Sequence, residues 1–235
     1  MFFFDPLWFI IMLPPLIFMI YAQSKVNSAF KKYSKVANSQ RITGAEAART
    51  LLRVNNLNNV KVEGVKGKLG DHYDPSKKVL RLSPAVANAP SVAALGIVAH
   101  EVGHAVQDQE GYAFMRFRSS LVPAANLGSS LGFVFVILGF LIYLFSGSEF
   151  GSYAVLAGIF LFSLAVLFSL ITLPVEYNAS NRARQMLRST GMVSVQEYNG
   201  ASAVLSAAAL TYVAATLQAV AQLFYFVLMF MGMRR

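Results

Sequence analysis

The chain of 235 residues is long enough for one domain with a modest core, but its composition excludes an ordinary soluble domain. Apolar residues make up 56% of it and charged residues 13%, against about 45–50% and about 25% in typical globular chains. The absence of cysteine excludes disulfide bonds and thiolate metal ligands. The net charge of +9 comes without interleaved aromatic and basic residues, so we expect basic flanks of membrane spans and no nucleic-acid partner.

Four apolar stretches predict four membrane-spanning helices, since a span needs about 20 predominantly apolar residues. The first covers 2–22, and Pro14 and Pro15 are expected to bend or break its helix. It lacks the basic start and the cleavage pattern of a secretory signal peptide, so we interpret it as an anchor. The other three spans are predicted at 123–145, 152–173 and 204–233. The short turn at 146–151 makes the second and third spans a hairpin.

Basic residues gather on one side of the predicted spans. They are Lys25, Lys31, Lys32, Lys35 and Arg41 after the first span, Arg116 and Arg118 before the second, and Arg182, Arg184 and Arg188 after the third. The positive-inside rule therefore places the two polar segments together in the cytoplasm, where they can build one site. The expected organisation is an anchor at 1–22, a catalytic portion at 23–121, a transmembrane hairpin at 122–173, a helical segment at 174–203, and a last span with its tail at 204–235.

Two capping boxes mark helix starts in the polar segments, because each pairs a hydroxyl and a carboxylate with backbone N–H groups. Thr43 and Glu46 predict a helix at about 45–54, and Ser194 and Glu197 predict the start of the last helix.

Between these helices, a valine-rich stretch at 60–65 and the stretch Val79 to Leu82 predict the strands of a small sheet, and 84–90 is expected to be a loop. The stretch 79–82 could be an edge strand that pairs with extended substrate backbone. The alternative is an ordinary strand of the small sheet.

Residues 100–104 read H-E-V-G-H inside a helix that we expect from about Ser91 to Gln109. Residues four apart lie on one helical face, so the imidazoles of His100 and His104 can bind one zinc ion. Glu101 borders the same site and can act as the base that takes a proton from the attacking water. The alternative is a chance match, but two of the three histidines in the chain fall in this one motif.

A catalytic zinc ion keeps three protein ligands and one open position. Glu110 stands where the metzincin pattern has its last ligand, but Gln107 replaces the glycine that turns the chain in that pattern. Glu176 follows shortly after the third span, on the same side as the histidines, and is the better candidate. The predicted ligands of one zinc ion are thus His100, His104 and Glu176. An oxyanion donor is also needed, and the sequence does not choose among Tyr177, Tyr212, Arg182 and His72.

Four strings together resemble the bacterial YugP-type neutral zinc metallopeptidases. They are DHYDP at 71–75, VLRLS at 79–83, HEVGHAVQ at 100–107 and LPVEYNAS at 173–180. The resemblance covers nearly the whole chain. It implies a multi-pass bacterial membrane protein with a gluzincin-like catalytic portion, related in plan to HtpX-type and CAAX-processing proteases. It also implies that the same two histidines and Glu176 are ligands and that Glu101 is the base.

One position departs from the HtpX-type pattern, which has an aspartate four residues after the ligand glutamate. Such an aspartate can orient a zinc-bound histidine. This chain has Ser180 there, so a weaker hydroxyl contact or another group must take that role.

The sequence thus predicts a mainly α, multi-pass integral membrane protein whose cytoplasmic zinc-peptidase portion contains a small β-sheet. The predicted function is zinc-dependent hydrolysis of membrane-associated proteins or peptides at the bacterial plasma membrane. The alternative is a zinc-binding membrane scaffold or chaperone-like adaptor without activity, against which the intact Glu101 argues.

Two further classes fit less well. A transporter needs ionisable residues inside its spans, and these spans have almost none. An intramembrane protease carries its metal motif within a span, and too few apolar residues precede His100 for that.

Overall fold

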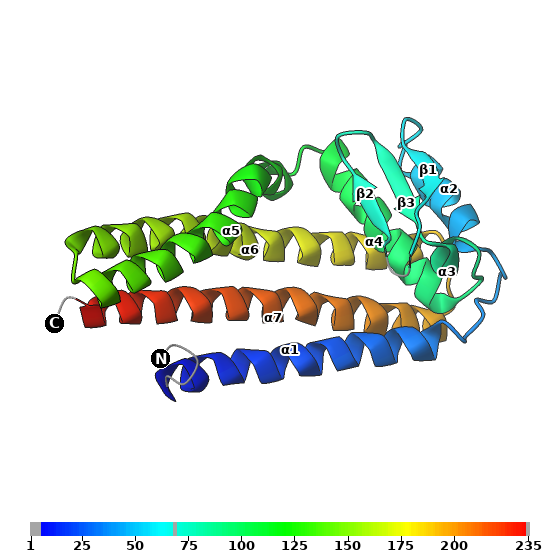
Figure 1. Cartoon of the computed structure of the whole chain (residues 1–235). Helices are drawn as coiled ribbons and strands as arrows, with labels where there is room; N and C mark the ends of the chain where they lie inside the picture. The colour runs from blue at the N-terminus through cyan, green and yellow to red at the C-terminus, as the bar shows by residue number, and fades with distance from the viewer. Residues whose placement is uncertain (1–5, 68–69, 234–235) are drawn as a thin grey trace. The chain divides into compact units, whose positions relative to one another are not determined.

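The computed structural model describes residues 6–67 and 70–233 of the chain. In chain order the elements are α1 (Pro6–Tyr33), α2 (Gly44–Val54), β1 (Lys61–Gly64), β2 (His72–Asp74), β3 (Val79–Leu82), α3 (Pro84–Ala87), α4 (Val92–Gln109), α5 (Ala113–Ser146), α6 (Glu149–Ser189) and α7 (Val195–Met233) (Figure 1). The predicted mainly α fold with a small sheet is confirmed. Among the described residues, α1, α5, α6 and α7 are long and apolar enough to cross a membrane, as predicted.

The chain forms two compact units, which are described separately. Among the described residues, the membrane unit comprises 6–21, 117–173 and 212–233. The polar unit comprises 22–67, 70–116 and 174–211. The helices α1, α5, α6 and α7 each contribute residues to both units, and the two polar segments, far apart in the sequence, belong to one unit.

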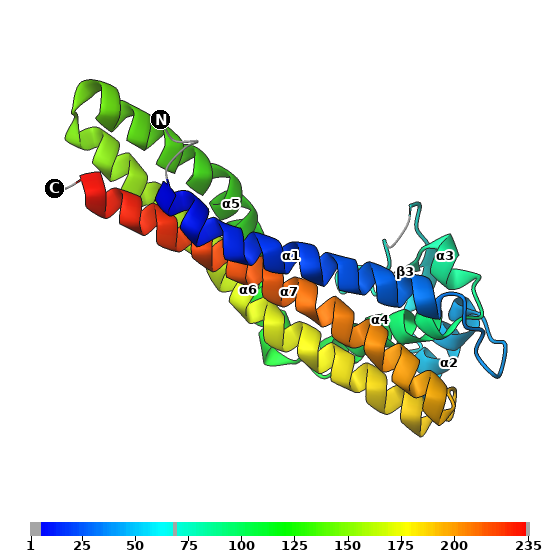
Figure 2. The same cartoon turned by 90° about the horizontal axis from the view of Figure 1, so that it is seen from below.

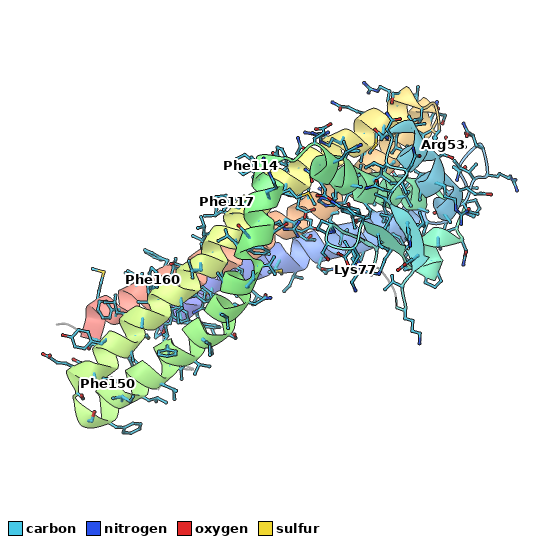
Figure 3. The ribbon with its side chains drawn as sticks, turned by 90° about the horizontal axis from the view of Figure 1, so that it is seen from above. Arg53, Lys77, Phe114, Phe117, Phe150 and Phe160 are labelled. Atoms are coloured by element: carbon cyan, nitrogen blue, oxygen red, sulfur yellow. The ribbon has the colours of Figure 1, made fainter. Side chains whose placement is uncertain are left out.

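The membrane unit presents large apolar side chains on its surface, as expected for a surface that faces lipid. Phe150 and Phe160 are 66% and 67% exposed, and both point away from the helices (Figure 3). Inside the unit, Trp8 of α1 packs against a cluster that includes Tyr225 and Phe226 of α7, and the two helices run side by side there (Figure 2).

The expected break of the first span is absent, because α1 runs through Pro14 and Pro15 as one helix. Membrane helices tolerate proline where neighbouring groups satisfy the freed carbonyl groups. The residues 2–5 of that predicted span lie outside the described part. In α6, Pro174 likewise lies inside one helix. The third predicted span and the segment that follows it are therefore continuous.

The hairpin of α5 and α6 depends on glycines that let the two backbones touch. A Cβ atom at Gly139 would lie 2.6 Å from the Val155 nitrogen, and one at Gly158 would lie 2.7 Å from the Gly132 oxygen. Small residues at such positions are the usual means of close helix packing in membranes.

In the polar unit, the sheet has the order β1-β3-β2. β1 pairs with β3 in parallel, with Lys61 opposite Val79, and β2 pairs with β3 in the antiparallel sense, with Tyr73 opposite Leu80. Of the two interpretations of 79–82, the edge strand is therefore wrong and the ordinary strand of the small sheet is confirmed, since β3 is covered on both sides. The covering strand β2 was not predicted, because its three residues have no strand pattern of their own.

The helix α4 lies at the centre of the polar unit's core. Leu95 and Val98 of α4 are fully buried, together with Leu51 of α2 and Leu80 of β3. The predicted caps are present: the Ser91 hydroxyl accepts a hydrogen bond from the Ala94 N–H at the start of α4. Both capping boxes are observed as well.

One expected loop is partly helical. In 84–90, the first four residues form the short helix α3 with Pro84 at its start. Proline is favoured there because the missing N–H would have no helical partner in any case.

Candidate metal centre

The helix α4 presents His100 and His104 one turn apart on the same face. Their ring centroids are 4.7 Å apart and the rings are nearly perpendicular. His104 is 8% exposed and His100 is partly exposed. The cap at Ser91 and the packing of α4 in the core hold this helix in place. The backbone positions of the two histidines are therefore fixed.

Glu176 of α6 lies directly opposite the two imidazoles. Its Oε2 atom is 3.1 Å from His100 Nε2 and 3.4 Å from His104 Nε2. The candidate ligand atoms of the three residues all lie within 4.8 Å of one another, so they could hold a metal ion. Two imidazole nitrogens and one carboxylate oxygen form a donor set that suits zinc.

The close approach of α6 to α4 depends on Gly103. A Cβ atom at this position would lie 2.7 Å from the Ala179 carbonyl oxygen. Gly96, two turns earlier, meets Ala201 of α7 in ordinary contact. The small residues on this helix thus let two other helices come close, and the approach at Gly103 brings Glu176 within reach of the histidines.

The electrostatics of the site favour positive charge. Burial alone would lower the pKa of His104, but its hydrogen bond with Glu176 and the nearby Glu101 carboxylate outweigh burial and raise that pKa. The two carboxylates therefore create a field in which a cation is stabilised. This is the environment that a divalent metal ion needs.

Glu101 is partly exposed to solvent, yet protein atoms surround its carboxyl group closely. Burial is the largest influence and raises its pKa, and Glu176 acts in the same direction, while the two imidazoles and the Tyr73 N–H oppose them. Its Oε2 atom accepts a hydrogen bond of 3.0 Å from that backbone N–H. A carboxylate with a raised pKa is a better proton acceptor than an ordinary glutamate.

The strand β2 is held against α4 by the side chain of Tyr73. The Tyr73 hydroxyl donates a 2.6 Å hydrogen bond to Asp108 of α4, which also pairs with Lys78 at 2.5 Å. These contacts hold Tyr73 where its backbone N–H donates a hydrogen bond to Glu101. Sequence reasoning missed them, although the DHYDP string that carries Tyr73 was noticed.

Two contacts address the histidine orientation that the sequence left open. The Ser180 hydroxyl lies 3.2 Å from His100 Nδ1, and the Gln107 amide lies 2.9 Å from His104 Nδ1. The sequence does not predict the second contact, because the orientation of Gln107 depends on its contacts with α6.

The other candidate residues lie elsewhere. Glu110 forms a two-bond ion pair with Arg182, at 2.9 Å and 2.6 Å, and does not belong to the metal-binding group. His72 lies on the exposed side of β2, where its Nδ1 atom donates to the Gly70 oxygen. Tyr177 is 44% exposed, and Tyr212 belongs to the membrane unit. The oxyanion donor stays an open prediction.

The fold and the site together define a membrane protein with a candidate metal centre of two histidines and one glutamate. The chain belongs to the family described as "Putative neutral zinc metallopeptidase", whose model matches residues 8–231. It is 47% identical over 215 residues to the "Putative membrane protease YugP" of Bacillus subtilis (strain 168), covering 91% of this chain and 92% of that protein. No solved structure matches the chain.

Proposed function

We propose that this protein is a membrane-bound zinc-dependent endopeptidase. The observation that carries the proposal is the convergence of His100, His104 and Glu176 beside the partly exposed carboxylate of Glu101. The three residues would hold one zinc ion, and Glu101 would act as the base. The family membership and the printed name of the Bacillus subtilis relative support a peptidase over other uses of such a site.

Zinc at this site would polarise the scissile carbonyl group and lower the pKa of the attacking water to about 7. The proton transfers would be carried out by Glu101. Glu101 keeps one carboxylate oxygen on the Tyr73 N–H, and its other oxygen takes the proton from the water as the new carbon–oxygen bond forms. Glu101 then passes this proton to the leaving nitrogen as the carbon–nitrogen bond breaks.

We further propose that the site faces the bacterial cytoplasm and acts on membrane proteins or on peptides near the inner leaflet. The basic residues that flank the predicted spans support this orientation. The four apolar helices support the membrane location. The substrate class follows from this placement of the site.

The test compares proteolysis by the purified wild type and by Glu101→Gln, each loaded with zinc. The variant should keep the zinc content of the wild type, because Glu101 is not a ligand. Its rate should fall by about 100-fold to 10,000-fold, the usual contribution of a general base. Equal rates would overturn the proposal. A wild type that binds zinc but cleaves no membrane protein or peptide would favour the adaptor alternative.

A further inference from the structure

Gln107 is a fully buried polar side chain beside the metal centre, and it makes three hydrogen bonds. Its Oε1 atom lies 2.9 Å from His104 Nδ1. Its Nε2 atom donates to the Val175 carbonyl oxygen at 2.8 Å and to Asn178 Oδ1 at 2.9 Å. The helix α6 thus supplies both acceptors for the amide nitrogen.

These neighbours fix which end of the Gln107 amide faces the histidine. The Val175 oxygen is a carbonyl acceptor, so only the NH₂ end of the amide can satisfy it. The orientation of the Asn178 side-chain amide is fixed in turn. Its oxygen also accepts a 2.7 Å hydrogen bond from Arg182 Nε, and an arginine can only donate. The Glu110 carboxylate holds the other nitrogens of Arg182.

The orientation of Gln107 determines the proton position on His104. An amide oxygen accepts but cannot donate, so His104 Nδ1 must carry a hydrogen and donate it to Gln107. In the neutral imidazole this leaves the lone pair on Nε2, the atom that faces Glu176. A neutral imidazole binds metal through its unprotonated nitrogen.

We infer that Gln107 is a positioning residue that holds the ring and the tautomer of His104 ready for the metal, and that Asn178 and Arg182 hold Gln107. The inference rests on the metal binding within the proposed function and does not depend on peptidase activity. His100 is held differently: its Nδ1 atom meets the Ser180 hydroxyl, which can donate or accept and therefore does not define a tautomer.

The first experiment measures the zinc dissociation constant of the full-length protein in detergent by competition with a chelator of known affinity. Gln107→Leu should bind zinc about 10-fold to 100-fold more weakly, the usual effect of removing such a partner. The matched control is Gln109→Leu on the same helix, whose amide makes only a 3.4 Å contact with the Asn56 oxygen. The control should bind zinc like the wild type. Unchanged binding by a folded Gln107→Leu overturns the inference.

A second pair of variants keeps the inference testable if Gln107→Leu does not fold. Asn178→Asp retains an oxygen that can accept from both Gln107 and Arg182, whereas Asn178→Leu removes it. The aspartate variant should bind zinc like the wild type, and the leucine variant should bind it at least about threefold more weakly. Equal zinc binding by the two variants overturns the inference. A wild type that binds no zinc would instead overturn the proposed function itself.

Discussion

Glu176 is the residue on which the candidate metal centre depends most directly. It is 2% exposed, and its Oε2 atom lies 3.1 Å from His100 Nε2 and 3.4 Å from His104 Nε2. Glu176→Ala would leave two histidines as ligands, which is fewer than a catalytic zinc site normally has. We expect zinc content after dialysis to fall from about one ion per chain to near zero, measured by elemental analysis.

The control for this prediction is Glu110→Ala, which removes the acid that the metzincin spacing would use. It should keep most of its zinc through dialysis, because Glu110 pairs with Arg182, which reaches Gln107 only through Asn178, and does not contact the histidines. Loss of zinc from Glu110→Ala together with retention by Glu176→Ala would contradict the proposed ligand set.

Glu101 also links the chemistry to stability. Burial raises its pKa in the folded protein, so the folded state binds this proton more tightly than the unfolded chain does. The group therefore contributes stability below its unfolded pKa of about 4.3, and this contribution is lost as the pH rises through the folded pKa. A glutamine at this position does not titrate.

We therefore expect zinc-free Glu101→Gln to gain in thermal stability relative to the zinc-free wild type as the pH is raised from about 5 to about 8. The measurement is the unfolding midpoint of both proteins in detergent with chelator present, across this pH range. A constant difference between the two midpoints would show that the carboxyl group does not titrate as the structure indicates.

At the scale of elements, the helices with local signals were predictable and the shortest strand was not. The capping serine directly precedes α4 and the two histidines lie within it, so the sequence indicated both the helix and the face that carries the histidines. The strand β2 exists through its pairing with β3 and the anchoring of Tyr73 to Asp108. No pattern within three residues could show these contacts between distant parts of the chain.

The contact of Gln107 with His104 shows the same limit at the site. The residue is three positions after its partner, yet its role depends on two acceptors that α6 supplies. Glu176 could be predicted because the order of spans and polar segments placed it beside the histidines. The residues that orient the histidines depend on how closely α4 and α6 approach each other, and the sequence does not show this.

The hairpin of α5 and α6 offers a test of helix packing in the membrane unit. Gly158→Ala would place a Cβ atom 2.7 Å from the Gly132 oxygen and the Val136 nitrogen, so the two helices must move apart. Lost close packing should lower the unfolding midpoint in detergent, because van der Waals packing between helices is one of the interactions that hold membrane helices together. The control is Gly232→Ala, since nothing lies within 4 Å of the new atom there. Equal midpoints for the two variants would contradict the packing.

At the scale of the whole molecule, two polar segments separated by the hairpin fold into one unit. The distribution of basic residues had predicted that both lie on one side of the membrane, and a single compact unit is consistent with that. Which side is the cytoplasm stays a prediction. The candidate metal centre joins the two segments, because α4 comes from the first and Glu176 comes from the second.

Zinc should therefore stabilise the polar unit by binding the folded state alone. A ligand at 100 times its dissociation constant adds about 2.7 kcal/mol to the free energy of unfolding. Hydrogen exchange measured with zinc and with chelator should show slower exchange in 92–109 and 174–189 when zinc is bound. The segment 123–145 of the membrane unit should be unaffected, since its apolar packing involves no ligand. In Glu176→Ala the effect of zinc should disappear, and a uniform slowing across all three segments would contradict a local site.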